Sequence, residues 1–306
     1  MTDDHLIFDR SLLFRRRDRA APHFQDHAFL LERAADDILE RLGAVRRQFP
    51  VALNLGAYNG LLSRRLRGFP GIELVIDAEP SARLLDQCDR PKVRADEEAL
   101  PFREGSLDLV VSALALHFVN DLPGTLVQIR RALKPDGLLL ATLFGGGTLQ
   151  ELRTSLLAAE AEVEGGASPR VAPFADVRAL GSLLQRAQFA LPVVDSDTVT
   201  VTYPNPLQLM HELRAMGASN VLRARHRLPL RRRTLQRALE IYVDRFGLDG
   251  GRVPATFEFI TLTGWAPHES QQKPLQPGSA RTRLADALGT KELPAGESAS
   301  AEKKLP

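Results

Sequence analysis

The stretch LNLGAYNG, residues 53–60, decides the fold. The apolar run VALNL before it predicts a buried strand, and LLSRRLRGF after it predicts a helix. Gly56 and Gly60 give the backbone the freedom to turn tightly between the two. A strand, a glycine turn and a helix in this order bring free backbone N–H groups to the carboxyl end of the strand. Open α/β sheets bind their ligands at this edge.

Strand-like and helix-like pieces alternate on the carboxyl side of this loop. We expect strands at 51–55, 72–77, 107–114 and 137–144, and helices at 61–69, 81–88 and 122–133. Pro135 and Gly137 are expected to break the chain before the fourth strand. This alternation predicts an α/β protein with a Rossmann-like parallel sheet that is covered by helices on both faces.

The pattern changes after residue 147. Helices are expected at 148–164, 176–189, 205–217 and 232–246, and strands at 195–203 and 255–265. We therefore expect a mostly parallel seven-stranded sheet with an antiparallel last strand. The expected domain limits are an N-terminal helical segment at 1–50, a main domain at 51–265 with a helical cap inserted at about 203–250, and a flexible tail at 266–306.

Composition limits the class of protein. The net charge of +2 and the low aromatic content of 6% argue against a nucleic-acid partner. The lone cysteine, Cys88, excludes an internal disulfide, and we expect it to be a buried or half-buried thiol without a role. We see no apolar run of the roughly 20 residues that span a bilayer, and no signal core in MTDDHLIF. A cytoplasmic protein is expected, and the sequence makes no prediction of its oligomeric state.

The basic residues are unevenly distributed and are dense in two stretches, RRRDR at 15–19 and RARHRLPLRRR at 223–233. Solvated helix faces are one interpretation. A docking surface for an acidic protein, or peripheral contact with an anionic membrane at its inner face, is the alternative.

Two acids follow the next strand-like segments. Asp77 ends the strand IELVID, where a carboxylate can accept both hydroxyls of a ribose. Asp96, in RADEEALPF, could accept from an adenine amino group while the peptide N–H of Glu97 meets a ring nitrogen. Solvent-facing acids are the alternative interpretation. Since no Walker lysine accompanies the loop, an adenosine without phosphates is favoured over NAD or ATP.

These motifs resemble those of a known family. Five segments, in unbroken order over 51–145, resemble the motifs of class I S-adenosylmethionine-dependent methyltransferases: LNLGAYNG, VIDAEPS, ADEEALPF, LDLVVSALALHFVNDL and RRALKPDGLLLATLFG. Four further segments resemble a narrower branch, the respiratory complex I assembly factors: FDRSLLFRRRDRAA, FGGGTLQELR, LMHELRAMGASNVLRAR and GWAPHESQQKP. This branch is related to the malonyl-carrier-protein methyltransferases of biotin synthesis. The resemblance implies S-adenosylmethionine as cofactor and a protein substrate, such as a complex I subunit. It implies either methyl transfer or hydroxylation of an arginine.

The resemblance also implies which residues contact the cofactor: Asn54, Gly56, Ala57, Tyr58, Gly60, Asp77, Ala78, Asp96, Glu97 and Ala113. Two positions depart from the family pattern, because Asn54 replaces an acid and Tyr58 replaces a second glycine. Loss of one charge-assisted contact costs roughly 1.5–3 kcal/mol, or about tenfold to a hundredfold in affinity. We expect weakened but retained cofactor binding.

Catalysis is assigned less directly. His117, in LALHFVND, is expected to face the substrate as a general base or contact, with a structural histidine as the alternative. Tyr203, Asn205 and His211 of the cap are further candidates for the pocket lining. Two rival functions stay open: a malonyl-carrier-protein O-methyltransferase, and a non-catalytic assembly chaperone that keeps the fold.

No metal site is expected. His23 and His27 have the i, i+4 spacing of paired ligands, but Phe24 stands where a zinc-protease helix carries its glutamate. The sequence shows no third ligand close to them.

Overall fold

The computed structural model describes residues 6–272, 279 and 282–291. A first compact unit ends at His268, and the short helix α10 (Leu284–Leu288) belongs to a second unit, Glu269–Pro306. The expected flexible tail therefore lies largely outside the described residues. Within the described ranges, no helix has both the length and the apolar character needed to cross a membrane.

A seven-stranded sheet in the order β3-β2-β1-β4-β5-β7-β6 forms the centre of the first unit. The strands are β1 (Val51–Leu55), β2 (Leu74–Ala78), β3 (Lys92–Val93), β4 (Leu107–Ala113), β5 (Leu133–Phe144), β6 (Ala190–Tyr203) and β7 (Val253–Trp265). Strands β1 to β5 pair in parallel, and β7 pairs antiparallel with both β5 and β6. The expected mostly parallel sheet with an antiparallel last strand is confirmed.

The expected break before β5 is wrong. Strand β5 begins at Leu133 and includes both Pro135 and Gly137. The pairing register of β4 with β5 shifts between Leu107 and Leu109, opposite this segment. Proline has no backbone N–H to donate to a neighbouring strand. It is tolerated at an irregularity because the regular hydrogen-bond pattern is already interrupted there.

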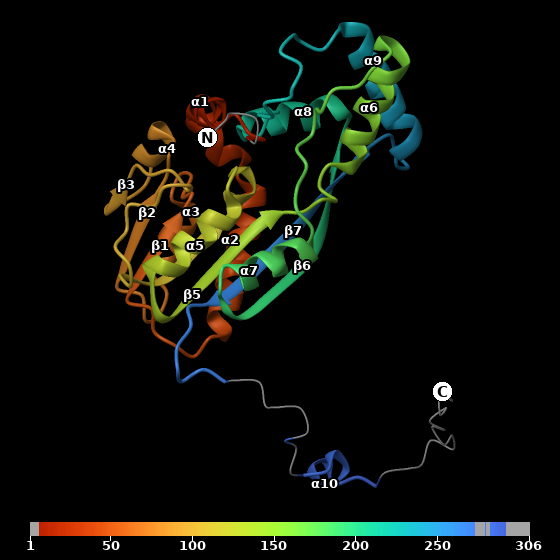
Figure 1. Ribbon diagram of the computed structural model, residues 1–306. Coiled ribbons are helices and arrows are strands. Elements are labelled where there is room, and N and C mark those ends of the chain that lie inside the picture. Colours follow the sequence, from red (N-terminus) through yellow and green to blue (C-terminus); the bar gives the residue numbers. More distant parts are fainter. Residues whose placement is uncertain (1–5, 273–278, 280–281, 292–306) are drawn as a thin grey trace, which may run out of the picture. The chain divides into compact units, whose positions relative to one another are not determined.

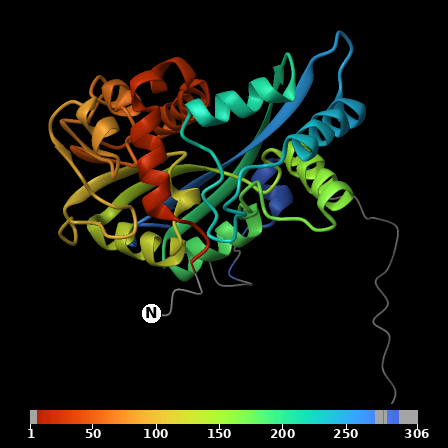
Figure 2. The same cartoon turned by 90° about the horizontal axis from the view of Figure 1, so that it is seen from above.

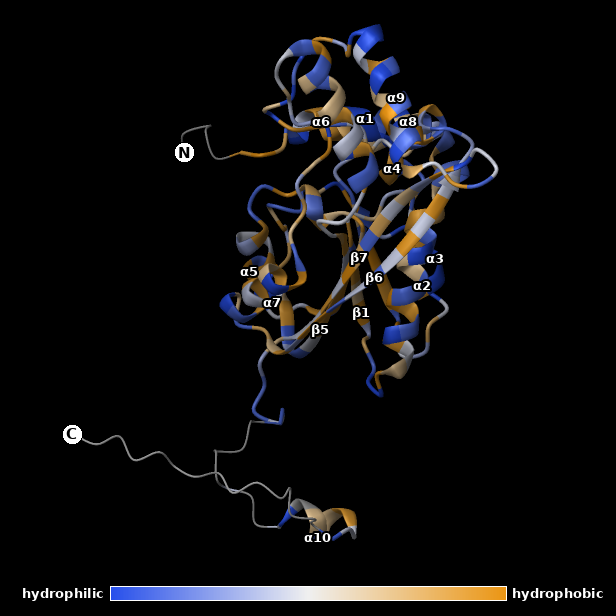
Figure 3. Ribbon diagram, turned by 90° about the vertical axis from the view of Figure 1, so that its right-hand side faces the viewer, coloured by the Kyte–Doolittle hydropathy of each residue, from blue (hydrophilic) through white to orange (hydrophobic). Residues whose placement is uncertain are grey.

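Helices cover both faces of the sheet. They are α1 (Arg10–Ala20), the 3-10 helix η2 (Ala21–His27), α2 (Phe29–Ala44), α3 (Leu61–Leu66), α4 (Ala82–Asp86), the 3-10 helix η3 (Leu116–Phe118), α5 (Leu122–Ala132), α6 (Gln150–Glu164), α7 (Val177–Arg186), α8 (Pro206–Ala215) and α9 (Arg232–Phe246). Figure 3 shows α2 and α3 on one side of the strands and α5 and α7 on the other. Leu109 and Val111 pack in the core that includes α2 and α3, whereas Val110 packs in the core that includes α5 and α7.

The remaining long helices gather beyond the carboxyl ends of the parallel strands. In Figures 1 and 2, α1, α6, α8 and α9 lie together on this side of the sheet. Helices α8 and α9 come from the expected cap region, and α6, from before β6, packs against α9. The switch in strand order between β1 and β4 opens toward this layer, which is where α/β sheets bind ligands.

Candidate active site

The glycine loop after β1 is fastened to the end of β2. The backbone N–H groups of Gly56 and Ala57 both donate to the carbonyl oxygen of Ala78, at 2.9 and 3.0 Å. Gly56 has φ +69°, and Gly60 has φ +75° at the residue that precedes α3. Tyr58, between them, has φ +50°. The loop thus has the tight, left-handed turns that the sequence predicts, including one at a residue that is not glycine.

Replacing Gly56 with alanine is expected to lower the free energy of unfolding by about 2–4 kcal/mol, since strain and overpacking act together. A Cβ built on Gly56 would lie 2.1 Å from the Cβ of Ala115, and φ is positive. The matched control is Gly43→Ala in α2, where a Cβ meets nothing within 4 Å and helix propensity predicts a gain of roughly 0.5–1 kcal/mol. Urea denaturation measures both; equal midpoints would contradict the expectation.

Asp77, the predicted ribose acid, faces away from this loop. It lies inside β2 in register with Asn54, and its side chain is fully buried. Its carboxylate accepts from Asn54 Nδ2 at 3.0 Å and from the Ser63 hydroxyl of α3. Arg67 Nη2 lies 3.4 Å away, and burial raises the pKa of Asp77. Asn54 and Asp77 therefore meet in a polar cluster beneath α3, and we correct the ribose assignment of Asp77 on this ground.

Glu79 is the acid that reaches the loop. It directly follows β2 and is fully buried. Its carboxylate accepts from the backbone N–H groups of Tyr58 and Ser81, both at 2.9 Å. Burial raises the pKa of Glu79 to about 7 although the nearby Arg17 lowers it. Glu79 was not among the predicted site residues. Its only signal in the sequence is its position two residues after Asp77, past the end of the same strand.

Asp96 and Glu97 come from the segment after β3 and engage the N-terminal helix. Arg10 of α1 bonds to Asp96 through Nη2 at 2.6 Å and also contacts the Glu97 carboxylate. Its other terminal nitrogen, Nη1, donates to the carbonyl oxygen of Phe118 at 3.0 Å. Glu97 is 1% exposed, whereas Asp96 is 36% exposed. The two acids thus lie at the expected edge of the sheet and pair with Arg10, which was not among the predicted site residues.

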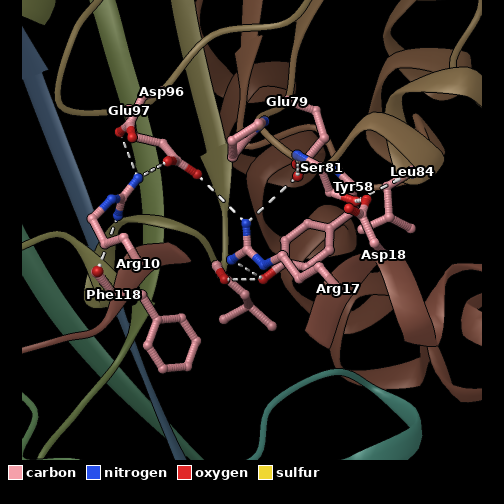
Figure 4. A network of polar contacts seen from close by, with 12 residues as sticks. Arg10, Arg17, Asp18, Tyr58, Glu79, Ser81, Leu84, Asp96, Glu97 and Phe118 are labelled. Carbon is pink, nitrogen blue, oxygen red and sulfur yellow. Dashed lines mark hydrogen bonds and ion pairs between the residues drawn. The ribbon is translucent and has the colours of Figure 1, made fainter. Parts of the chain in front are cut away.

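Arg17 of α1 lies between the acids from the two strands. Its Nη1 is 3.7 Å from Glu79 and 3.5 Å from Glu97, and the side chain is 2% exposed. Its Nη2 donates to the Tyr58 hydroxyl at 3.0 Å, and its guanidinium lies 4.5 Å from the centre of the Tyr58 ring. Figure 4 shows this guanidinium pointing between the two carboxylates and against the ring. Nothing in the run RRRDR distinguishes Arg17 from its neighbours.

His117 borders a cavity of about 70 Å³ next to Tyr58. Six of its other lining residues are Phe24, Tyr58, Leu114, Phe118, Phe144 and Phe174. The imidazole is 8% exposed, and neither ring nitrogen has a hydrogen-bond partner among the described residues. Burial lowers the pKa of His117 to about 3. The cavity therefore holds one uncharged, unpartnered polar group among aromatic walls, close to the loop.

The three cap candidates do not join this cavity. Asn205 caps α8, accepting from the N–H of Gln208, so its side chain is used structurally. His211 is exposed on α8, and Tyr203 is buried against the core. None of the three is among the lining residues, which corrects their assignment.

The other predicted residues have ordinary surroundings. Ala113 ends β4, and the buried Cys88 donates from Sγ to the Tyr58 carbonyl oxygen at 3.3 Å. His27 pairs with Glu212 at 2.7 Å, and His23 is exposed. In the described part of the chain, no group of three or more His, Cys, Asp or Glu side chains could hold a metal ion.

The strand order, the glycine loop after β1 and the acids after β2 and β3 define a class I methyltransferase fold. A methyltransferase domain model matches residues 53–141. The YcgJ protein of Bacillus subtilis shares the fold with a TM-score of 0.53 at 12% identity, covering 76% of this chain and 98% of that one.

Similarity over nearly the whole chain is more specific. The arginine-hydroxylase NDUFAF5, mitochondrial, of Danio rerio is 41% identical over 92% of this chain and 89% of its own length. The human protein of the same name is 42% identical over 92% of this chain and 83% of its own length. A malonyl-[acyl-carrier protein] O-methyltransferase of Halorhodospira halophila is 36% identical over 91% of this chain and 95% of its own length. The chain belongs to the NDUFAF5 arginine-hydroxylase family, within a wider group that includes the carrier-protein methyltransferases.

Proposed function

We propose that this chain is an S-adenosylmethionine-dependent enzyme of the methyltransferase fold that modifies a protein substrate in respiratory complex I assembly. One observation supports it above the others: acids after β2 and β3 share one sheet edge with the glycine loop. The carboxylates of Glu79 and Asp96 are then in the order that a ribose and an adenine require. The complex I assignment rests on the resemblance of the terminal motifs and on the family.

The residues present fit the cofactor by the chemistry of their donors and acceptors. Glu79 would accept the ribose hydroxyls, Asp96 the adenine amino group, and the Glu97 peptide N–H would meet a ring nitrogen. When bound, S-adenosylmethionine supplies an electrophilic methyl group. Asn54 bonds to Ser63 and Asp77 beneath α3, so its replacement of an acid is compensated inside the protein rather than at the ligand.

His117 would act on the substrate side. With a pKa of about 3 the imidazole stays uncharged and is a weak base, so it would hold the substrate side chain by accepting a hydrogen bond at a ring nitrogen, while its aromatic surroundings exclude water. Methyl transfer to a good nucleophile needs chiefly alignment. The name of the relatives states arginine hydroxylation, so the analysis of the product has to distinguish a methyl group from a hydroxyl oxygen.

A basic groove beside the cavity supports a protein partner with an acidic segment. Its lining residues include Arg16 and Arg19 of α1, His23 of η2 and Arg214 of α8. His27 of η2 lines both the groove and the cavity. Burial lowers the pKa of Arg16, and the neighbouring arginines lower it further because like charges repel. An acidic segment bound here would direct one of its side chains toward His117. A cytoplasmic location at the inner face of the membrane is part of this proposal.

Calorimetric titration with S-adenosylmethionine tests the proposed function. We expect a dissociation constant in the micromolar range, typical of enzyme substrates, and no binding of NAD as the control. Mass spectrometry of a complex I subunit and of a malonyl carrier protein, each incubated with the enzyme, then identifies the product. A modified subunit supports the proposal, and a methylated carrier supports the biotin-pathway rival. Absence of S-adenosylmethionine binding would favour the assembly chaperone.

A further inference from the structure

The guanidinium of Arg17 lies where the proposed nucleoside ligand would bind. Glu79 and Glu97, which are 0% and 1% exposed, both face Arg17 Nη1. Their distances from it, 3.7 and 3.5 Å, are long for charge-assisted hydrogen bonds, and this nitrogen makes no hydrogen bond among the described residues. Arg17 therefore balances two buried charges through contacts that are poorly optimised.

Helix α1 is attached to the rest of the protein mainly through charged and polar contacts. Besides the contacts of Arg10, Asp18 accepts from the Ser81 hydroxyl at 2.6 Å and from the backbone N–H of Arg83 at 3.1 Å. The buried residues of α1 are Arg10, Leu13, Arg17 and Ala20, so only two are apolar, whereas all six buried residues of α2 are apolar. Leu12 and Phe14 also pack, partly buried, against the apolar cluster that contains Leu13. Because apolar burial is the main driving force of packing, α1 can withdraw at a smaller loss of apolar contact than α2.

We propose that Arg17 is an internal competitor of the nucleoside ligand: S-adenosylmethionine binds only when α1 withdraws the guanidinium from Glu79 and Glu97. The inference rests on the proposed function of the same site. A ligand that must displace Arg17 binds with its intrinsic affinity reduced by the fraction of molecules in which α1 has withdrawn. Arg17 thereby sets the affinity of the site for its ligand without contacting that ligand.

The test compares charge-balanced variants by calorimetric titration with S-adenosylmethionine. Arg17→Met alone would remove the cation that faces the buried Glu79 and one of the two that face the buried Glu97, which also contacts Arg10. It is therefore combined with Glu97→Gln, which leaves the net charge of the buried cluster unchanged and keeps the peptide N–H at position 97. Glu97→Gln alone shows the effect of that change, and Arg15→Met, at an exposed position of α1, is the matched helix control. We expect the double variant to bind roughly tenfold tighter or more than wild type, and Arg15→Met to bind like wild type. Circular dichroism confirms that each variant is folded.

Hydrogen–deuterium exchange of wild type gives a second readout. Ligands usually protect the amides that they cover; here the amides of residues 10–20 should exchange faster when S-adenosylmethionine is bound. The role of Arg17 would be overturned if the double variant bound S-adenosylmethionine no more tightly than wild type and the ligand protected the amides of α1 from exchange. The proposed function would still stand in that case. Binding by the double variant alone supports both proposals. Absence of binding by every variant overturns both.

Discussion

Replacing His117 with phenylalanine is expected to raise the free energy of unfolding while removing catalytic activity. Both ring nitrogens are buried and have no hydrogen-bond partner within the described part of the chain, and each such group costs about 1–3 kcal/mol of desolvation. Phenylalanine has a similar shape, and the site already contains the rings of Phe118, Phe144 and Phe174 at centroid distances of 4.2, 4.9 and 5.2 Å. A gain in stability with a loss of activity is the signature of a residue that is kept for function.

The gain should grow as pH falls below 6.5. The pKa of His117 drops from 6.5 to about 3 on folding, so below 6.5 the unfolded chain binds a proton that the folded chain does not. The destabilisation that this titration adds is absent above pH 6.5 and grows as pH falls, to a total on the order of 5 kcal/mol toward pH 3. The raised pKa of Glu79 acts in the opposite direction, since its stabilising effect is lost as pH rises from 4.5 toward 7.

Because these two groups oppose each other, the difference between His117→Phe and wild type at each pH is the quantity to measure. Urea denaturation on either side of pH 6.5 provides it, and His211→Phe, at an exposed site on α8, is the control. A His117→Phe protein less stable than wild type at every pH would mean that the imidazole has a partner in solution, and would refute its description as an unpartnered group.

Substitution of the two acids of VIDAEPS should separate ligand binding from stability. In Glu79→Gln we expect affinity for S-adenosylmethionine to fall about a hundredfold or more, because two charged hydrogen bonds to ribose hydroxyls, each worth roughly 1.5–3 kcal/mol, are weakened. In Asp77→Ala affinity should stay within about threefold of wild type. The free energy of unfolding should instead fall by about 2–4 kcal/mol, since the donors of Asn54 and Ser63 lose their shared acceptor.

Calorimetry and urea denaturation of the same two preparations decide between the acids. The expected pattern is that the position 79 variant loses binding and the position 77 variant loses stability. The reverse pattern, in which Asp77→Ala abolishes binding and remains as stable as wild type, would restore Asp77 as the ribose ligand and remove Glu79 from the site.

The altered glycine loop has a structural explanation in the same network. Tyr58 replaces a glycine, yet its backbone N–H bonds to Glu79 and its hydroxyl donates to the Leu114 carbonyl oxygen at 2.5 Å. Its ring stacks on Phe24 at a centroid distance of 5.2 Å and lies under the Arg17 guanidinium. The side chain that departs from the family pattern is thus part of the internal site that holds Arg17.

The sequence alone determined the architecture. Alternation of apolar residues with period two or 3.6, punctuated by glycine and proline, predicted four of the five strands of 51–144 and the order of the α-helices between them, because these periods report which side of an element is buried. The two-residue strand β3 was not predicted, since it is too short to show a period. The helix at 232–246 was predicted with its limits unchanged. The edge of the sheet that carries the site followed from the same pattern, since the carboxyl ends of parallel strands must meet there.

Only the tertiary structure decided which side chains occupy that edge. Asp77 lies inside β2 and Glu79 directly follows it, and the choice between them depends on where α3 covers the strand, which no local pattern encodes. Arg17 reaches Glu79 and Glu97 from a helix more than 60 residues earlier in the chain, in a run of arginines that look equivalent. Long-range ion pairs and cavities depend on how separate elements pack, and periodicity describes each element alone.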